Sequence, residues 1–182
     1  MAKADAMDTD APRDIRDLLG FRLSLLTTVS DRKAQAQISA KFGMNLGEWR
    51  TLGAIKAWGP ATLAELARTL YQDKGQLSRT IKSLSQRGLV SSAYGAQGRR
   101  SPLFRLTLEG RRQHDRMLRY AGDRNAHLLD ALAPRERVQI FQILDKLRNA
   151  AEEAYREVSA GNAKGRGVAL QRARRQRPEA RP

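Results

Sequence analysis

Three observations predict a mainly helical fold with one small β-hairpin. Apolar residues recur at helical spacing along most of the chain. Signals for the start of a helix, in which Asn, Thr or Asp precedes Glu or Gln by three residues, begin at Asn45, Thr62 and Asp73. Two short apolar runs, 89–94 and 102–106, flank a turn that contains glycine, a pattern typical of a hairpin. The fold class is therefore mainly α with a minor β component.

The composition limits the classes of function. The 182 residues allow one domain with tails, and 34 basic against 19 acidic residues give a formal net charge of +15. A polyanionic partner fits this charge, because each Lys or Arg that neutralises a phosphate releases a condensed counterion. An arginine-rich and alanine-rich composition inherited from a GC-rich genome would give the same charge without any binding role. Charge alone therefore leaves both interpretations open.

Several chemistries are excluded or disfavoured. The chain has no cysteine, which removes disulfides, thiolate catalysis and cysteine-based zinc sites. It contains no G-x-S-x-G, Walker or H-E-x-x-H motif, and two histidines thirteen residues apart on one helix, His114 and His127, point about 220° apart. We expect no catalytic residues, no metal and no cofactor. The lack of a long apolar segment predicts a cytoplasmic protein without membrane contact.

The first half of the chain predicts three helices. The first runs from about Arg13 to Lys41, the second from Asn45 through Trp58 until Gly59-Pro60 stops it, and the third is a short helix after Thr62. Arg22 lies in the middle of the first helix's apolar stripe, which is formed by Ile15, Leu18, Leu19, Leu26 and Val29.

A fourth helix has two contrasting faces. Asp73 caps its start, and it runs to about Arg87 before Gly88. With Leu77 at the centre of the buried face, the helical periodicity places Leu84 and Ile81 beside it. The opposite face is polar, mostly small and cationic, and comprises Gly75, Ser78, Arg79, Lys82 and Gln86.

The second half predicts a hairpin and two long helices. Arg99 and Arg100 lie at the hairpin turn. Thr107 caps a helix to about Leu132, on whose apolar stripe His114 is expected as a core or interface residue. Pro134 opens a last helix to about Val158.

The chain is thus expected to have three parts. Residues 1–12 form a disordered N-terminal arm, residues 13–160 form the folded domain, and residues 161–182 form a disordered tail. The tail carries seven basic residues against Glu179. Additional non-specific affinity for DNA and a silent, solvated tail are both open interpretations of that charge.

Two short helices, a helix with a cationic outer face and a basic hairpin describe a winged helix-turn-helix. The major groove, about 12 Å wide, admits one helix whose outward side chains reach base edges. Gly75 and Ser78 permit close approach, and Arg79 can bond a guanine in two places. The residues expected to contact DNA are Lys74, Gly75, Gln76, Ser78, Arg79 and Lys82 on the helix and Arg99 and Arg100 on the wing.

The run from Leu46 to Gly110, with the segments LGEWRTLGAIKAWGPATLAELARTLYQDKGQLSRTIKSLSQRGLV and GRRSPLFRLTLEG, resembles the multiple-antibiotic-resistance regulator (MarR) family. The resemblance extends over about residues 13–158. It implies a winged-helix lobe with long N- and C-terminal dimerisation helices, an obligate homodimer, and a small-ligand pocket between lobe and dimerisation helices. The family's wing usually reads Asp-x-Arg, whereas Gly98 stands at the Asp position here, which leaves Arg100 without a bracing carboxylate.

The dimer has support from the residues themselves. Apolar stripes on the helices at both ends exceed what a small lobe can cover, and a second copy would bury them. Two-fold symmetry would place two recognition helices roughly 34 Å apart and so predicts a pseudo-palindromic operator.

The resemblance also implies release from DNA by a small compound, often aromatic and anionic. Arg22 is a cation among apolar residues, and we hypothesise that it pairs with a ligand carboxylate or phosphate beside Leu25 and Trp49. A salt bridge within or between chains, or a side chain that extends to solvent, is the alternative.

The expected function is a sequence-specific regulator that binds double-stranded DNA, a repressor released by its ligand. The alternatives are a helical homodimer that binds a protein partner, and an RNA-binding module built on the G-x-x-G sequence at 95–98. The second alternative conflicts with the expected two-stranded wing, because such RNA-binding domains need a three-stranded sheet.

Overall fold

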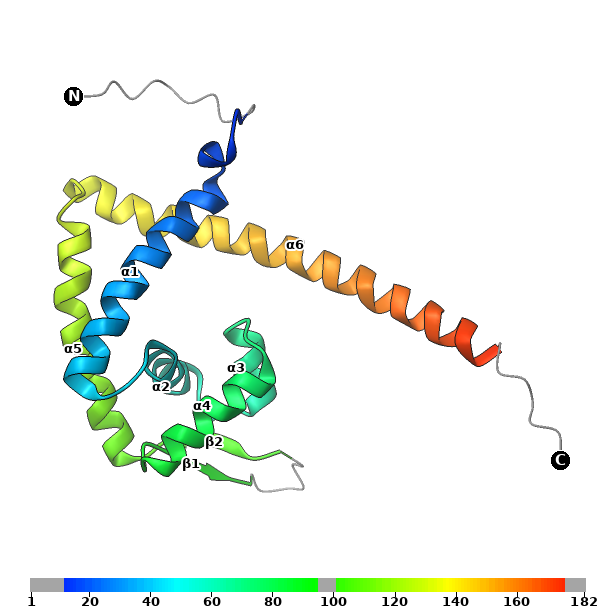
Figure 1. Ribbon diagram of the computed structural model, residues 1–182, viewed down its shortest axis with the longest axis horizontal. Coiled ribbons are helices and arrows are strands. Elements are labelled where there is room, and N and C mark those ends of the chain that lie inside the picture. Colours follow the sequence, from blue (N-terminus) through cyan, green and yellow to red (C-terminus); the bar gives the residue numbers. More distant parts are fainter. Residues whose placement is uncertain (1–11, 95–100, 176–182) are drawn as a thin grey trace. The chain divides into compact units, whose positions relative to one another are not determined.

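The computed structural model describes residues 12–94 and 101–175, with side chains through Ser159 (Figure 1). It confirms the predicted class, mainly α with a winged helix. The elements in order are η1 (Ile15–Asp17), α1 (Leu19–Phe42), α2 (Leu46–Trp58), α3 (Leu63–Thr69), α4 (Lys74–Gln86), β1 (Val90–Ala93), β2 (Leu103–Leu106), α5 (Leu108–Leu129) and α6 (Pro134–Arg175). The described residues fall into two compact units, which divide between Gly122 and Asp123.

The first unit contains the winged-helix core. Leu52 of α2, Leu66 of α3 and Leu77 and Leu84 of α4 are fully buried in one apolar cluster, which also includes Met117 of α5. Burial of one such side chain contributes about 1.5–3 kcal/mol to folding. The helix-turn-helix is therefore held from behind by the apolar face of each of its helices.

The wing is an antiparallel pair whose register runs from Val90 opposite Leu106 to Ala93 opposite Leu103. A bridge ties β2 to the loop before α3, because Phe104 N donates to Ala61 O at 2.8 Å and Ala61 N donates to Phe104 O at 3.3 Å. The wing is thereby fixed to the helix-turn-helix at its base.

Side-chain caps set the starts of the central helices, as the sequence predicted. Capping boxes begin α2, where Asn45 Oδ1 accepts from Glu48 N at 2.8 Å, and α3, where Thr62 pairs with Glu65. At α5, Thr107 Oγ1 accepts from Gly110 N at 2.9 Å. These bonds satisfy backbone N–H groups that lack partners within the helix.

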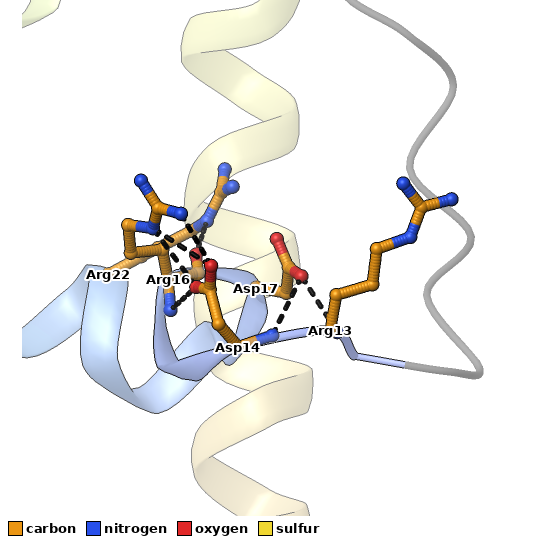
Figure 2. A network of polar contacts seen from close by, with 5 residues as sticks. All are labelled: Arg13, Asp14, Arg16, Asp17 and Arg22. Carbon is orange, nitrogen blue, oxygen red and sulfur yellow. Dashed lines mark hydrogen bonds and ion pairs between the residues drawn. The ribbon is translucent and has the colours of Figure 1, made fainter.

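The first helix starts later than the sequence predicted. A single helix from about Arg13 was expected, but the chain forms the short η1, passes through Leu18 in an extended conformation and only then enters α1. The cause is a local polar network (Figure 2). Asp14 accepts from Arg16 N at 2.7 Å, and Asp17 Oδ2 accepts from Arg13 N at 2.9 Å, which closes a separate capped turn. The Arg16 side chain, hydrogen-bonded to Asp14, lowers the pKa of that carboxyl.

The second unit contains the end of α5 and all of α6. Pro134 opens α6 as expected. The backbone N of Ala133 donates to Glu136 Oε2 at 2.7 Å, which is one half of a capping box; alanine has no side chain to make the other half. Arg137 Nη2 donates to Asp130 Oδ1 at 3.2 Å across the turn.

The last helix is longer than expected. The sequence predicted an end at about Val158 and a disordered tail from Gly161, whereas α6 continues through Arg175. Residues 161–175 hold Ala, Leu, Gln, Lys and Arg, which favour helix, between three glycines, which do not. The strong helix formers prevail over this stretch.

Some predictions lie outside the described residues. These are the N-terminal arm up to residue 11, the G-x-x-G turn with Arg99 and Arg100, and the last residues, 176–182. Among the helices that the structure describes, none combines the length and the apolar character that crossing a bilayer requires.

Candidate nucleic-acid interface

Helix α4 presents the polar face that its sequence predicted. Asp73 Oδ1 accepts from Gln76 N at 2.9 Å and fixes the start of the helix. Leu77, Ile81 and Leu84 are buried. All six predicted contact residues on this helix are exposed: Lys74, Gly75, Gln76, Ser78, Arg79 and Lys82. We call these six residues the reading face.

At its N-terminal end the reading face includes Gly75, from which no side chain projects. A Cβ added at Gly75 would lie 3.1 Å from Asp73 Oδ1 and 3.9 Å from Arg79 Nη1, so the guanidinium of Arg79 lies near the first turn of the helix. The absence of a side chain at Gly75 leaves the backbone accessible beside that guanidinium. Such a surface can approach a base edge closely, and Arg79 can donate to it with two N–H groups.

The electrostatics of the reading face are cationic. Lys74, Arg79 and Lys82 are exposed, and α4 contains no acidic residue. Asp73, the nearest carboxylate in sequence, is engaged by the backbone of Gln76. The first turn thus combines exposed cations with the positive end of the helix dipole, an arrangement that attracts phosphate.

The wing contributes less to the described surface. Both arginines expected to contact DNA, Arg99 and Arg100, lie outside the described residues. At the described ends of the hairpin, Tyr94 and Arg105 are exposed. The described interface therefore consists chiefly of α4.

A buried carboxylate behind α4 was given only a capping role by the sequence. Glu48 of α2 is 5% exposed and accepts from two side chains of α4's C-terminal part, Ser83 Oγ at 2.7 Å and Arg87 Nη1 at 3.3 Å. These partners are 35 and 39 residues away in sequence. The capping-box motif indicates the carboxylate but carries no signal for such distant partners.

The three residues proposed to bind a ligand lie on two different helices. Arg22 and Leu25 are exposed on α1, and Arg22 Nε donates to the backbone carbonyl of Arg16 at 2.6 Å (Figure 2). Trp49 of α2 is half-buried, with its ring centroid 5.3 Å from that of His114. The expectation of a buried cation at Arg22 is therefore wrong for the single chain, because the break at Leu18 directs it to the η1 turn.

His114 is buried in α5, as predicted for a core or interface residue. Its Nδ1 lies 2.9 Å from Asp115 Oδ1, and this hydrogen bond lowers the pKa of Asp115. No group of three or more His, Cys, Asp or Glu side chains among the described residues is arranged to hold a metal ion.

Among the hollows on the described surface of the first unit, two are lined by residues near the helix-turn-helix and along α5. One, of about 440 Å³, lies over α2 and the α3–α4 turn, and is lined by Arg50, Gly53, Ala54, Ala57, Trp58, Leu70 and Gln72. The other, of about 470 Å³, follows one side of α5 and is lined by Glu109, Arg112, Asp115, Arg116 and Arg119. The first has an aromatic wall and the second is almost entirely charged.

The fold and the reading face together define a winged helix-turn-helix protein. Residues 42–101, about a third of the chain, match the model of the MarR family, and the resemblance to this family is thereby confirmed. A comparison with curated proteins gives no match.

Solved structures of MarR-type regulators share the fold. A MarR/EmrR family transcriptional regulator from Acinetobacter sp. ADP1 is 24% identical with a TM-score of 0.70, over 77% of this chain and 99% of that chain. BpsR of Bordetella bronchiseptica is 22% identical with a TM-score of 0.66, over 76% and 98%. MepR of S. aureus, solved as a DNA complex, is 18% identical with a TM-score of 0.65, over 73% and 98%. At these identities the likeness establishes the fold.

Proposed function

We propose that this protein is a transcriptional regulator that binds double-stranded DNA by inserting α4 into the major groove. The observation that carries the proposal is the reading face, whose six residues are exposed, include three cations and no large apolar side chain, and have no acidic neighbour on the helix. The family match over 42–101 and the DNA complex of MepR support the same function. The proposal assigns no catalytic activity and places the protein in the cytoplasm.

Sequence-specific binding can be tested with a random pool of duplexes. Those that the purified protein retains are amplified, and the enriched sequence is titrated against a scrambled duplex at several salt concentrations. We expect a pseudo-palindromic sequence, a binding constant that falls steeply with salt, and saturation at one dimer per site. Better competition by single-stranded RNA than by duplex, or no enrichment, would contradict the proposal.

A homodimer is the proposed active form. Large apolar residues are exposed along the first part of α1, among them Leu26 and Val29, which are 59% and 70% exposed. Helix α6 also exposes Val138, Phe141 and Ile143. Exposed apolar surface on this scale is covered at a protein interface in most soluble proteins. Two copies related by a two-fold axis would present two reading faces to adjacent major grooves.

Release by a small aromatic acid is the proposed regulation, with repression as the resting state. BpsR has its DNA binding regulated by 6-hydroxynicotinic acid, and the same class of compound is the first to test here. An effector releases the operator if it binds more tightly to a dimer whose reading faces are wrongly spaced for DNA than to the dimer that fits DNA. A difference of about 3 kcal/mol between these two binding free energies lowers operator affinity more than a hundredfold.

The effector site can be located through the two tryptophans. Trp58 lines the hollow on α2, whereas Trp49 is not among its lining residues and packs against the ring of His114. Fluorescence titration of Trp49→Phe and Trp58→Phe with 6-hydroxynicotinic acid shows which indole the compound approaches. Arg22→Ala is measured in parallel, and an unchanged response of this variant would eliminate Arg22 as the anion's partner.

A further inference from the structure

A single carboxylate joins α4 to the segment that links α1 and α2. Glu48 Oε1 accepts from Ser83 Oγ at 2.7 Å, while Glu48 Oε2 accepts from Asn45 N at 3.0 Å and from Arg87 Nη1 at 3.3 Å. Three donors from two helix ends therefore meet on one side chain, which is almost completely buried. We call Glu48, Ser83 and Arg87 the α2–α4 clamp.

The clamp extends to the end of α1. Arg87 Nη1 also donates to the backbone carbonyl of Gly43 at 3.1 Å. Gly43 is the C-cap of α1 and has a φ of 58°, a left-handed conformation that suits glycine. Arg87 itself is the C-cap of α4. One guanidinium therefore lies where the ends of α1 and α4 meet the start of α2.

Stability alone gives a poor account of this arrangement. The Glu48 side chain is 6% exposed and that of Arg87 is 35% exposed, so the carboxylate loses most of its hydration in this ion pair. Apolar residues of similar volume often stabilise such a site equally well. What the buried carboxylate provides is a defined geometry, because it accepts hydrogen bonds from the start of α2 and from the end of α4 at once. A capping role is equally insufficient, because Glu65 caps α3 with the same motif from an exposed position.

We propose that Glu48 is a positioning residue for DNA reading, which fixes α4 relative to α1 and α2. This inference rests on the proposed DNA-binding function. Base contacts tolerate errors of only about 0.5 Å and 10–20°, whereas phosphate contacts by long flexible side chains tolerate more. Loosening the clamp should therefore reduce discrimination between sequences more than it reduces affinity for DNA in general.

The first test is Glu48→Gln, with Glu65→Gln as the matched control. Glutamine keeps the size and an oxygen for the cap but removes the charge that Arg87 faces. We expect about a tenfold loss in the ratio of affinities for selected and scrambled duplexes, equivalent to about 1.4 kcal/mol. Affinity for the scrambled duplex should change less than about twofold. Glu65→Gln should keep the wild-type ratio, because Glu65 caps α3 and not α4.

The second test is Ser83→Ala, which removes one donor to Glu48 while leaving the cap and both charges in place. A smaller loss of discrimination is expected. The double variant with Glu48→Gln should lose less than the sum of the two single losses, because both changes act on the hydrogen bonds of one side chain. Circular dichroism and thermal melting confirm that each variant is folded at the assay temperature.

The outcomes distinguish a failure of the positioning role of Glu48 from a failure of the proposed DNA-binding function. If folded Glu48→Gln discriminates as the wild type does, or if Glu65→Gln loses as much, the positioning role is wrong. If Glu48→Gln fails to fold, wild-type discrimination by Ser83→Ala overturns the inference. Wild-type protein that discriminates no sequence overturns the proposed function and the inference with it.

Discussion

At the residue scale, Gly110 in the first turn of α5 lies directly against the backbone of Leu89, the residue before β1. A Cβ at this position would lie 1.9 Å from the carbonyl oxygen of Leu89, which also accepts from Thr107 N at 3.1 Å. Gly110→Ala must therefore push the first turn of α5 away from the wing, and we expect a loss of about 1–3 kcal/mol in the free energy of unfolding.

Gly122 on the same helix is the control for Gly110. It is exposed, and an added Cβ would have no neighbour within 4 Å. Gly122→Ala should stabilise the protein by about 0.5–1 kcal/mol, because alanine restricts the unfolded chain and favours helix. Urea denaturation of both variants at one protein concentration checks the opposite signs; equal effects would mean that Gly110 is not required for the approach.

A second prediction at this scale concerns pH. The hydrogen bond from His114 lowers the pKa of Asp115 in the folded protein, so the pair's contribution is present above the ordinary aspartate value of about 3.9 and is lost as pH falls through the lower folded value. The urea midpoints of wild type and Asp115→Asn should differ at pH 6 and converge below about pH 3.9. Exposed Asp123, changed to Asn, is the control; a constant difference at all pH values would exclude the pair as the cause.

The sequence predicts the helix caps, but it does not predict the side-chain contacts between helices. The caps at Asn45, Thr62 and Asp73 were predictable, because a cap and its partner lie three residues apart. The contacts of Glu48 with Ser83 and Arg87 were not, because they depend on how α2 packs on α4. The surroundings of Arg22 were predicted wrongly, because a local turn capped by Asp14 delays the start of the helix to Leu19 and Arg22 bonds to that turn.

At the element scale, the start of α4 combines a structural cap with a DNA-facing surface. Asp73 caps the helix but also places a negative charge beside Lys74 and Gly75. Asn caps as well as Asp does, so Asp73→Asn should leave stability within about 0.5 kcal/mol of wild type. Removal of the charge should strengthen binding of any duplex about threefold at low salt.

Asp73→Ala distinguishes the two roles of this residue. It removes the same charge together with the cap, and should cost about 1 kcal/mol of stability. Thermal melting and titration with a scrambled duplex measure both effects. If Asp73→Asn weakens duplex binding, the first turn of α4 does not face phosphate.

Element types and most boundaries followed from periodicity and turn chemistry. The two faces of α4 are those that helical spacing predicted around Leu77, and the hairpin strands lie within the predicted runs. The exceptions lie at the ends of the chain. The break at Leu18 depends on a capped turn, and the extension of α6 to Arg175 depends on a balance between glycine and strong helix formers.

At the scale of the whole molecule, the exposed apolar residues of α1 predict assembly. Leu26 is 59% exposed and belongs to the apolar stripe, whereas Ser24 lies about 200° around the helix from it. Leu26→Glu should therefore weaken the dimer, while Ser24→Glu should leave it intact. Sedimentation at micromolar concentration measures both, and a monomeric wild-type protein would contradict the dimer.

The measurement that tests the central claim most directly compares Arg79→Ala with Lys82→Ala on selected and scrambled duplexes. Both side chains are exposed on α4, but only the Arg79 guanidinium lies near Gly75, at the N-terminal end of the reading face. Arg79→Ala should cost about 1–3 kcal/mol on the selected duplex and little on the scrambled one. Lys82→Ala should weaken both duplexes equally and reduce the salt slope by about one. If Arg79→Ala discriminates the two duplexes as well as wild type does, α4 does not read DNA through this face.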